Sequence, residues 1–172
     1  MKWVGLLIMC VWSHYSFGEV LNFDKSGKLY VDIHKSWELK KDVFGFPFMA
    51  FSPTEMGQKS NLSFLASGES LAFDEVRMKK EVDDYKKIKT DWAEKVGAKI
   101  LKTYPLSTNV NSKGHKIHKI GIDYSFNNKN YIETSYYIEC RGKLYFSKSL
   151  LLRENSSRQK DVDEMIKGLD CE

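Results

Sequence analysis

The chain has 172 residues and carries 27 Lys and Arg against 23 Asp and Glu, a formal net charge of +4 at pH 7. The basic residues are spread along the chain rather than gathered in a stripe, which argues against nucleic acid as a partner. No repeat, low-complexity tract or Pro/Gly-rich linker divides residues 19–172, so this part is predicted to form a single domain that can bury a core.

The N-terminus has the three parts of a secretory signal peptide. Lys2 precedes an uncharged run over residues 3–12, and the polar segment after it ends in small residues. We predict that residues 1–18 are removed and that the protein is exported, either to a periplasm or fully secreted. Cys10 raises the alternative of a lipoprotein, but Ile8 and Met9 precede it where small residues are needed.

A membrane anchor is not predicted. The apolar run of the leader has about ten residues, whereas a helix that spans a bilayer needs roughly twenty. No later stretch of the sequence approaches that length. The mature chain is therefore predicted to have no transmembrane segment.

Short strands are predicted over residues 20–23 and 29–33, on either side of a turn. Residues 37–51 are rich in aromatic side chains but contain Pro47, which cannot donate a hydrogen bond to a sheet ladder. An edge strand or a loop-strand is therefore predicted there. Another short strand is predicted over residues 61–66.

The clearest element is a helix over about residues 74–96. Asp74 is a good N-cap, and Gly97 is typical of the position after a helix. Apolar residues recur at steps of three and four along it: Met78, Val82, Tyr85, Ile88, Trp92 and Val96. This stripe predicts the face that packs against a sheet, although such a face can also bind a membrane or a partner helix.

A short strand is predicted over residues 99–104, closed by Pro105 and followed by a polar loop over residues 107–114. Apolar residues then alternate along three segments joined by short turns, a pattern typical of an antiparallel meander: 118–126, 132–140 and 144–152. A short helix over about residues 157–169 ends the chain.

This order of elements predicts an α+β fold, in which an antiparallel sheet carries a long and a short helix. Helices can then cover both faces of the sheet. The pattern resembles the PsbP/Mog-like α/β/α sandwich family over most of residues 28–169. The resemblance rests on Trp37, Phe51-Ser52-Pro53, Asn61-Leu62-Ser63-Phe64, the long helix, Ile100-Leu101, Gly114, the run from Tyr136 to Tyr145 and the closing helix.

This resemblance implies a non-enzymatic binding or accessory domain, because the family has no shared catalytic residues to transfer. The predicted leader matches the exported members of the family. Its motifs are hydrophobic patterns, so the resemblance implies no ligand and no particular partner.

Two cysteines, Cys140 and Cys171, remain after removal of the leader. An exported protein meets an oxidising compartment, so a structural disulfide between them is predicted. A closed loop of about thirty residues contributes roughly 3.5–4 kcal/mol in the chain-entropy model. The alternative is a redox or metal-binding pair, but the sequence has no Cys-x-x-Cys motif and no His close to either residue.

Catalytic, cofactor and metal sites are not predicted. The sequence lacks a Gly-x-Ser-x-Gly elbow and a glycine-rich phosphate loop. His115 and His118 look suggestive, but side chains three apart on a strand point to opposite faces and cannot chelate one ion as a pair. A hydrolase assembled from scattered residues is the least favoured alternative.

The candidate binding surface is the second face of the meander, where Tyr131, Tyr137 and Tyr145 are predicted to lie near Glu133, Glu139 and Lys119. Tyrosines among charges are common in recognition surfaces. The competing interpretation is that a helix covers this face. The favoured function is an exported accessory protein that contacts another protein in the cell envelope. The alternative is a small-molecule or lipid-binding pocket between the sheet and the long helix, lined from Trp92, Tyr85, Phe46, Phe48 and Phe51.

Overall fold

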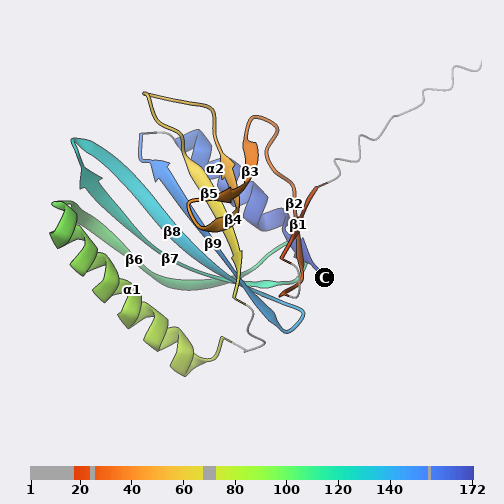
Figure 1. Ribbon diagram of the computed structural model, residues 1–172. Helices are drawn as coiled ribbons and strands as arrows, with labels where there is room; N and C mark the ends of the chain where they lie inside the picture. The colour runs from red at the N-terminus through yellow and green to blue at the C-terminus, as the bar shows by residue number, and fades with distance from the viewer. Residues whose placement is uncertain (1–17, 24–25, 68–72, 155) are drawn as a thin grey trace, which may run out of the picture.

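The computed structural model describes residues 18–23, 26–67, 73–154 and 156–172, so the predicted signal peptide lies outside the described residues except for Gly18. Strand β1 (Glu19–Asn22) begins at the residue predicted to follow the cleavage site. Helices lie on both sides of a large twisted sheet (Figure 1). This arrangement confirms the predicted α+β fold.

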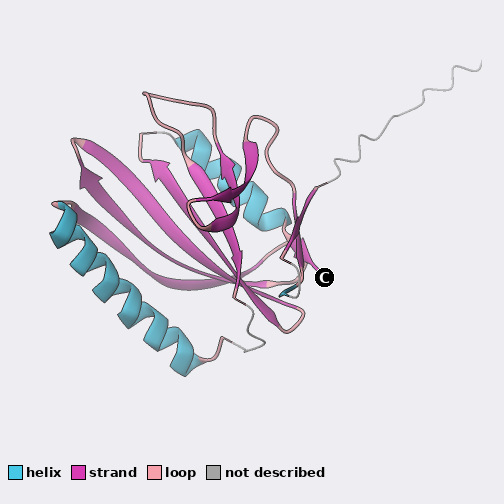
Figure 2. Cartoon of the chain, viewed as in Figure 1, coloured by secondary structure: helices cyan, strands magenta, loops and turns pink. Residues whose placement is uncertain are grey.

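The large sheet has seven antiparallel strands in the order β3-β4-β5-β9-β8-β7-β6, shown in magenta in Figure 2. The strands are β3 (Glu38–Val43), β4 (Phe46–Phe51), β5 (Asn61–Ala66), β6 (Lys99–Val110), β7 (Lys116–Phe126), β8 (Lys129–Cys140) and β9 (Lys143–Leu152). The predicted meander forms its β7-β8-β9 centre. Its two turns place Asn127, Asn128, Arg141 and Gly142 at positive φ, as two-residue hairpin turns require.

A second sheet has three short strands in the order β1-β2-β10. Strand β2 (Lys28–Val31) lies between β1 and β10 (Asp170–Cys171), which is the last described element of the chain. The two predicted N-terminal strands are therefore present. The pairing of the C-terminal residues with β2 was not predicted, because a two-residue strand has no readable periodicity.

Helix α1 (Glu75–Val96) agrees with the predicted helix at both ends. The side chain of Asp74 accepts a hydrogen bond from the Arg77 N–H at 2.8 Å, and Gly97 adopts a left-handed conformation that closes the C-terminus. Neither α1 nor the shorter helix α2 (Ser156–Gly168) combines the length and apolarity needed to cross a bilayer.

The two helices cover opposite faces of the large sheet, which we call the α1 face and the α2 face. Among the described residues, twenty form the buried core of the α2 face, including Val162, Met165 and Ile166 of α2 and residues of the small sheet. The α1 face holds a smaller cluster of four buried residues: Tyr85, Ile120, Ile122 and Tyr124. Hydrophobic burial therefore concentrates on the α2 face.

Two predicted boundaries were wrong. The segment over residues 37–51 is a hairpin rather than one strand: β3 is an edge strand of the sheet, as predicted, but Pro47 lies in its neighbour β4, and the turn between them places Phe44 and Gly45 at positive φ. The predicted loop over residues 107–114 was too long, because β6 continues past Pro105 to Val110. A register shift lies between Tyr104 and Ser107, and Pro105 is tolerated there because β6 is an edge strand.

Candidate functional site

The α1 face is built from alternating residues of the three meander strands. Directly opposed pairs put Tyr124 beside Tyr131, and Tyr137 beside Phe146. Helix α1 adds Tyr85 and Trp92 above them. The result is a layer of aromatic rings between the sheet and a helix.

One chain of aromatic contacts runs across this face towards β5. The rings of Trp92 and Tyr124 meet edge to face with centroids 4.9 Å apart, and those of Tyr124 and Tyr131 stack at 5.2 Å. Tyr131 then donates its hydroxyl to the Oε1 atom of Gln58 at 2.9 Å. Tyr131 keeps a half-buried ring with a polar end, a combination common in recognition surfaces.

A buried carboxylate lies at the centre of the face. Glu133 is 7% exposed, and its Oε1 atom lies 2.5 Å from Lys89 Nζ and 3.8 Å from Lys148 Nζ. The Tyr85 hydroxyl donates to the same oxygen at 3.4 Å. Burial lowers the pKa of Lys148, an effect that Glu133 opposes. Burial, reinforced by Glu133, raises the pKa of Tyr85, so its phenol stays protonated at neutral pH.

A second aromatic group lies at the other end of the face. The ring of Phe73 stacks on Tyr137 at 4.8 Å and contacts His118 at 4.7 Å. Tyr137 also donates to Glu81 Oε2 of α1 at 3.1 Å. Burial raises the pKa of Tyr137, and Glu81 adds to the effect. These contacts attach the first half of α1 to the sheet.

His118 joins a hydroxyl and a carboxylate, an order also found in catalytic triads. Its Nδ1 atom lies 2.8 Å from Thr108 Oγ1, and its Nε2 atom lies 2.7 Å from Glu139 Oε1. Thr108 is the cross-strand neighbour of His118 on β6, and Glu139 belongs to β8 on the other side. Both ring nitrogens are thus hydrogen-bonded, which accounts for the burial of this imidazole within the sheet.

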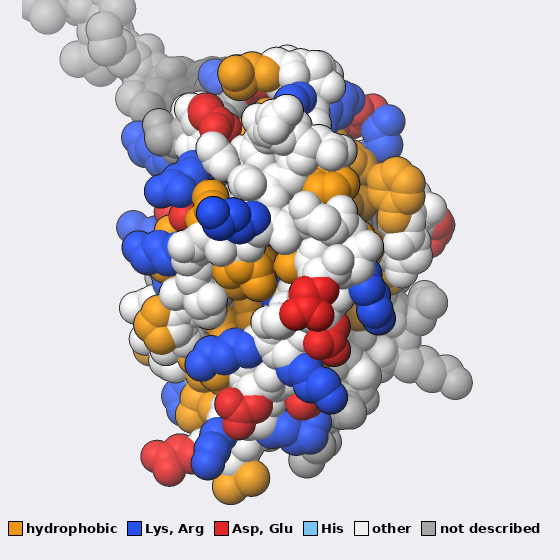
Figure 3. Space-filling model, turned by 90° about the vertical axis from the view of Figure 1, so that its left-hand side faces the viewer, with side chains coloured by type: hydrophobic (Ala, Val, Ile, Leu, Met, Phe, Trp, Pro, Cys, Tyr) orange, Lys and Arg blue, Asp and Glu red, His pale blue; other side chains and the backbone are white. Residues whose placement is uncertain are grey.

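Helix α1 packs loosely on this face. Of its six predicted core residues, only Tyr85 is fully buried, whereas Ile88 is 61% exposed and Val96 is 41% exposed. The predicted apolar stripe therefore faces the sheet, but part of it remains exposed to solvent. On the side of the molecule drawn in Figure 3, hydrophobic side chains remain visible between Lys and Arg side chains.

Two hollows open between α1 and the sheet. One has a volume of about 410 Å³ and is lined by Trp92, Tyr124, Tyr131 and Leu150 together with Gln58. The other has a volume of about 200 Å³ and lies over Glu133, Lys89 and Lys148. Phe48 of the predicted pocket belongs to the core of the α2 face instead.

The structure does not bring the three predicted tyrosines together. Tyr131 and Tyr137 lie on the α1 face, but Tyr145 lies opposite Ile138 and is fully buried in the core of the α2 face. The reason is the two-residue turn at Arg141-Gly142, which pairs Cys140 with Lys143 and so puts residue 145 beside residue 138. Lys119 also lies on the α2 face.

The sequence interpretation noted Glu133 but missed its two lysine partners. Lys148 sits on β9 between Phe146 and Leu150, so a charge at an inward position of an apolar alternation was the available signal. Lys89 carried no such signal, because it lies among other charged residues of α1 and only the packing turns it towards Glu133.

The α2 face has a hollow of its own beside α2, with a volume of about 460 Å³. Tyr104, Gly121, Ile132 and Tyr136 line it from the sheet, and Asp163 lines it from the helix. Gly121 has no space for a side chain, because a Cβ atom there would meet the Glu133 carbonyl oxygen at 2.7 Å. Burial raises the pKa of Tyr136 to about 12.

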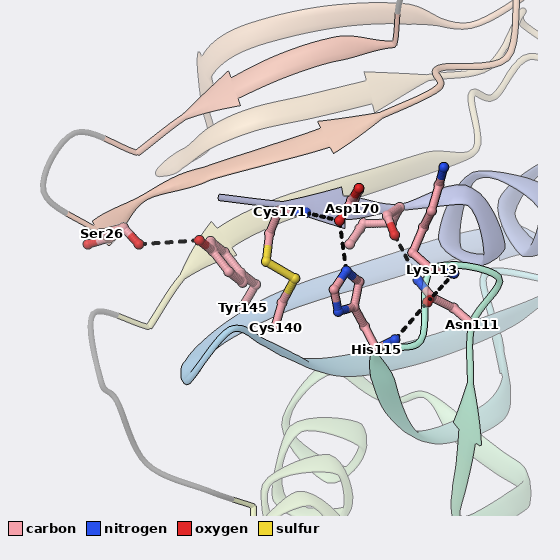
Figure 4. The surroundings of a disulfide bond; sticks show 9 residues. Ser26, Asn111, Lys113, His115, Cys140, Tyr145, Asp170 and Cys171 are labelled. Atoms are coloured by element: carbon pink, nitrogen blue, oxygen red, sulfur yellow. Dashed lines mark hydrogen bonds and ion pairs between the residues drawn. A yellow bond between two sulfur atoms is a disulfide. The ribbon is translucent and has the colours of Figure 1, made fainter.

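The predicted disulfide is present. Cys140 at the end of β8 bonds to Cys171 in β10, and the bond links the large sheet to the small one beside Tyr145 (Figure 4). Both cysteines are buried. His115, which is distant in sequence, lies next to the bond.

No protein-family model matches the chain, and no curated protein matches it. Solved structures do match in shape. LpqN of Mycobacterium tuberculosis, described as involved in cell envelope biogenesis, has a TM-score of 0.56 at 9% identity, covering 92% of this chain and 87% of LpqN. The cyanobacterial PsbP protein (CyanoP) of Synechocystis sp. PCC 6803 has a TM-score of 0.59 at 15% identity, covering 98% of this chain and 100% of CyanoP. The chain therefore has a PsbP-like fold.

Proposed function

We propose that the protein is an exported, non-enzymatic accessory protein of the cell envelope that binds another protein through its α1 face. The observation that carries this proposal is the incomplete closure of that face, where α1 leaves aromatic rings half-buried and Ile88 61% exposed. Open aromatic and apolar surface rimmed by charges is typical of sites that bind proteins. The α2 face offers less of this surface because most of it is core.

Three further observations support an exported protein of the cell envelope. The leader pattern in residues 1–18 indicates export, and the disulfide is typical of exported proteins. LpqN, which shares the fold, is described as acting in cell envelope biogenesis.

Photo-crosslinking from defined positions tests this function. A crosslinking amino acid at position 88, on the open side of α1, should capture one specific protein in the intact cell envelope. The matched control is position 44, where Phe44 is 84% exposed on the β3-β4 turn at the opposite edge of the sheet. The proposal fails if position 88 captures no specific protein, or captures the same set as position 44.

A second function is favoured by one specific observation, the aromatic hollow of about 410 Å³ at Trp92 and Tyr131. Its volume falls within the usual range for small-ligand pockets, about 300–1,000 Å³. A medium-chain fatty acid is a suitable probe. Leu150→Trp should fill the hollow and abolish binding, whereas Leu101→Trp on the exposed part of β6 should leave it unchanged. Equal binding by both variants would exclude this hollow as the site.

A further inference from the structure

A histidine accompanies the two cysteines in the tertiary structure although none is close to them in sequence. One ligand atom from each of His115, Cys140 and Cys171 lies within 4.8 Å of the others. The cysteines are buried, and the side chain of His115 is 13% exposed. Thiolate and imidazole together are the preferred ligands of Zn²⁺.

We propose that reduction of the disulfide converts this cluster of three residues into a binding site for a thiophilic divalent cation such as Zn²⁺, with Cys140, Cys171 and His115 as its ligands. The site is independent of the α1 face and of the function proposed for it. The cysteine pair then has two states. In the oxidised state it is joined by the disulfide, and in the reduced state its two thiolates bind a metal ion.

The imidazole is already held as a metal-binding histidine would be. Asp170 Oδ1 lies 2.8 Å from His115 Nε2, which leaves Nδ1 as the ring atom that can bind a metal. Figure 4 shows the ring beside the disulfide, with its second nitrogen on the side of the sulfur atoms. A carboxylate that accepts from the far nitrogen fixes the tautomer and the orientation of a metal-binding histidine.

Asp170 also contacts the main chain of one of the cysteines. The same Oδ1 atom accepts a hydrogen bond from the backbone N–H of Cys171 at 2.8 Å. One carboxylate oxygen therefore positions both His115 and the main chain of Cys171. We assign Asp170 as a positioning residue of the proposed site.

Besides the disulfide, several hydrogen bonds hold together the segments that carry His115, Cys140 and Cys171. The three side chains therefore stay close to one another after reduction. Asn111 donates its amide to the Leu169 carbonyl at 2.8 Å and accepts from the His115 N–H at 3.0 Å. Ser112 donates its hydroxyl to the Lys167 carbonyl at 2.7 Å. At the chain end, the Glu172 N–H donates to the Lys28 carbonyl at 3.1 Å. The turn before β7 and the end of α2 are thus joined without the sulfur atoms.

The chemistry requires a reductant, which we take to be a dithiol. Two thiol groups of the reductant deliver two electrons and two protons to the Cys140–Cys171 bond, which yields two protein thiols and the oxidised reductant. Binding of Zn²⁺ then releases the two thiol protons, because thiolates are the ligands.

Binding of a metal ion requires only a small movement of the chain. A tetrahedral zinc ion with Zn–S bonds of about 2.3 Å holds its two sulfur atoms about 3.8 Å apart, so the sulfur atoms must separate after reduction. Cys171 can move because β10 pairs with β2 through only two residues. Three protein ligands leave the fourth position for water, an arrangement also found in open zinc sites.

Cobalt is the probe for the experiment, because Co²⁺ replaces Zn²⁺ and absorbs light when thiolates bind it. The full mature chain is reduced, freed of reductant without oxygen and titrated with Co²⁺. We expect one equivalent to bind with a thiolate-to-cobalt charge-transfer band, which Zn²⁺ then removes. The oxidised protein should show no such band.

Two variants assign the ligands. His115→Gln should weaken binding about tenfold or more, whereas the matched control His34→Gln, at a half-buried histidine beside Asp161, should bind as the unchanged chain does. Asp170→Asn should retain the thiolate band but lower the affinity about 10–100-fold, as expected of a positioning residue.

The proposal is overturned if the reduced chain binds Co²⁺ without the thiolate band, or if His115→Gln binds as tightly as His34→Gln. Circular dichroism before the titration shows whether the reduced chain is folded. If it is unfolded, addition of Zn²⁺ should refold it, and failure to refold would also overturn the proposal.

Discussion

The α2 face of the large sheet is mainly apolar and packed into a core apart from the hollow beside α2, whereas the α1 face keeps aromatic rings and charges partly exposed. In the part of the chain that the structure describes, twenty buried residues form the core on the α2 side, which includes the small sheet and the disulfide. On the α1 side, a 22-residue helix buries only Tyr85 and Ala93, which are 7% and 5% exposed. The comparison indicates that most of the hydrophobic burial lies on the α2 face, and the partly exposed α1 face is for this reason the one proposed as a binding surface.

Loss of the disulfide should have the largest effect. The link closes a loop across 31 positions, so the double variant Cys140→Ser/Cys171→Ser should lose about 3.5–4 kcal/mol of unfolding free energy. Urea denaturation with a chelator present measures this loss, and reductant should then have no further effect on the variant. An unchanged midpoint would show that the α2 face does not depend on the link.

Adjacent leucines of β9 compare the two faces directly. Leu151 is 1% exposed in the core of the α2 face, whereas Leu150 is half-buried beside the hollow of the α1 face. Leu151→Ala should cost about 2–5 kcal/mol, while Leu150→Ala should cost clearly less, about 1 kcal/mol, because its site is already open. Equal losses in chemical denaturation would contradict the difference between the faces.

Acid should weaken the α2 side through Asp161. Burial alone would raise the pKa of Asp161, but hydrogen bonds from Trp37 Nε1 at 2.9 Å and from Arg158 at 3.0 Å outweigh it and lower the pKa. The stabilisation is therefore present above about pH 4 and is lost as the pH falls through the lowered pKa.

Asp161→Asn tests this pH dependence. The variant should be about 1.5 kcal/mol less stable at pH 7, the low end for a hydrogen bond to a charged group, because Asn still accepts from Trp37. Thermal melts from pH 7 to pH 2 should show the difference from the unchanged chain shrinking in acid. A constant difference would exclude the ionised carboxylate as its source.

The smallest effect is expected at the N-cap of α1. Asp74→Ala removes the hydrogen bond to the Arg77 N–H and should destabilise the helix by about 1 kcal/mol. Because α1 packs loosely, this loss should appear as faster hydrogen exchange in residues 75–96 with little change in β8 and β9. Uniformly faster exchange would show that α1 unfolds only with the whole domain.

Much of the fold could be read from local signals. The caps at Asp74 and Gly97, the alternation in the meander and the apolar residues of α2 each lie within one element, and all appear where the sequence predicted them. The β3-β4 hairpin was missed because its turn uses Phe44-Gly45, which lacks the usual Asn or Asp. The sequence predicts a strand end at Pro105 because the irregularity that lets β6 continue past it leaves no local pattern.

The length of the turn between β8 and β9 indicates which tyrosines share a face. Alternation within one strand separates Tyr137 from Ile138, but the match between β8 and β9 depends on the length of their turn. Two residues at Arg141-Gly142 set Tyr145 beside Ile138. Counting across that turn would have removed Tyr145 from the candidate surface.

Local sequence was enough to specify the ends of α1, the alternation within the meander strands and the two cysteines available for a bond, because periodicity, capping and composition act over a few residues. Three features depend on how the chain packs: how much of its face α1 covers, which lysines reach Glu133, and the position of His115 beside Cys140 and Cys171. These contacts join residues far apart in the chain, and their positions are set by sheet register and core packing rather than by local sequence.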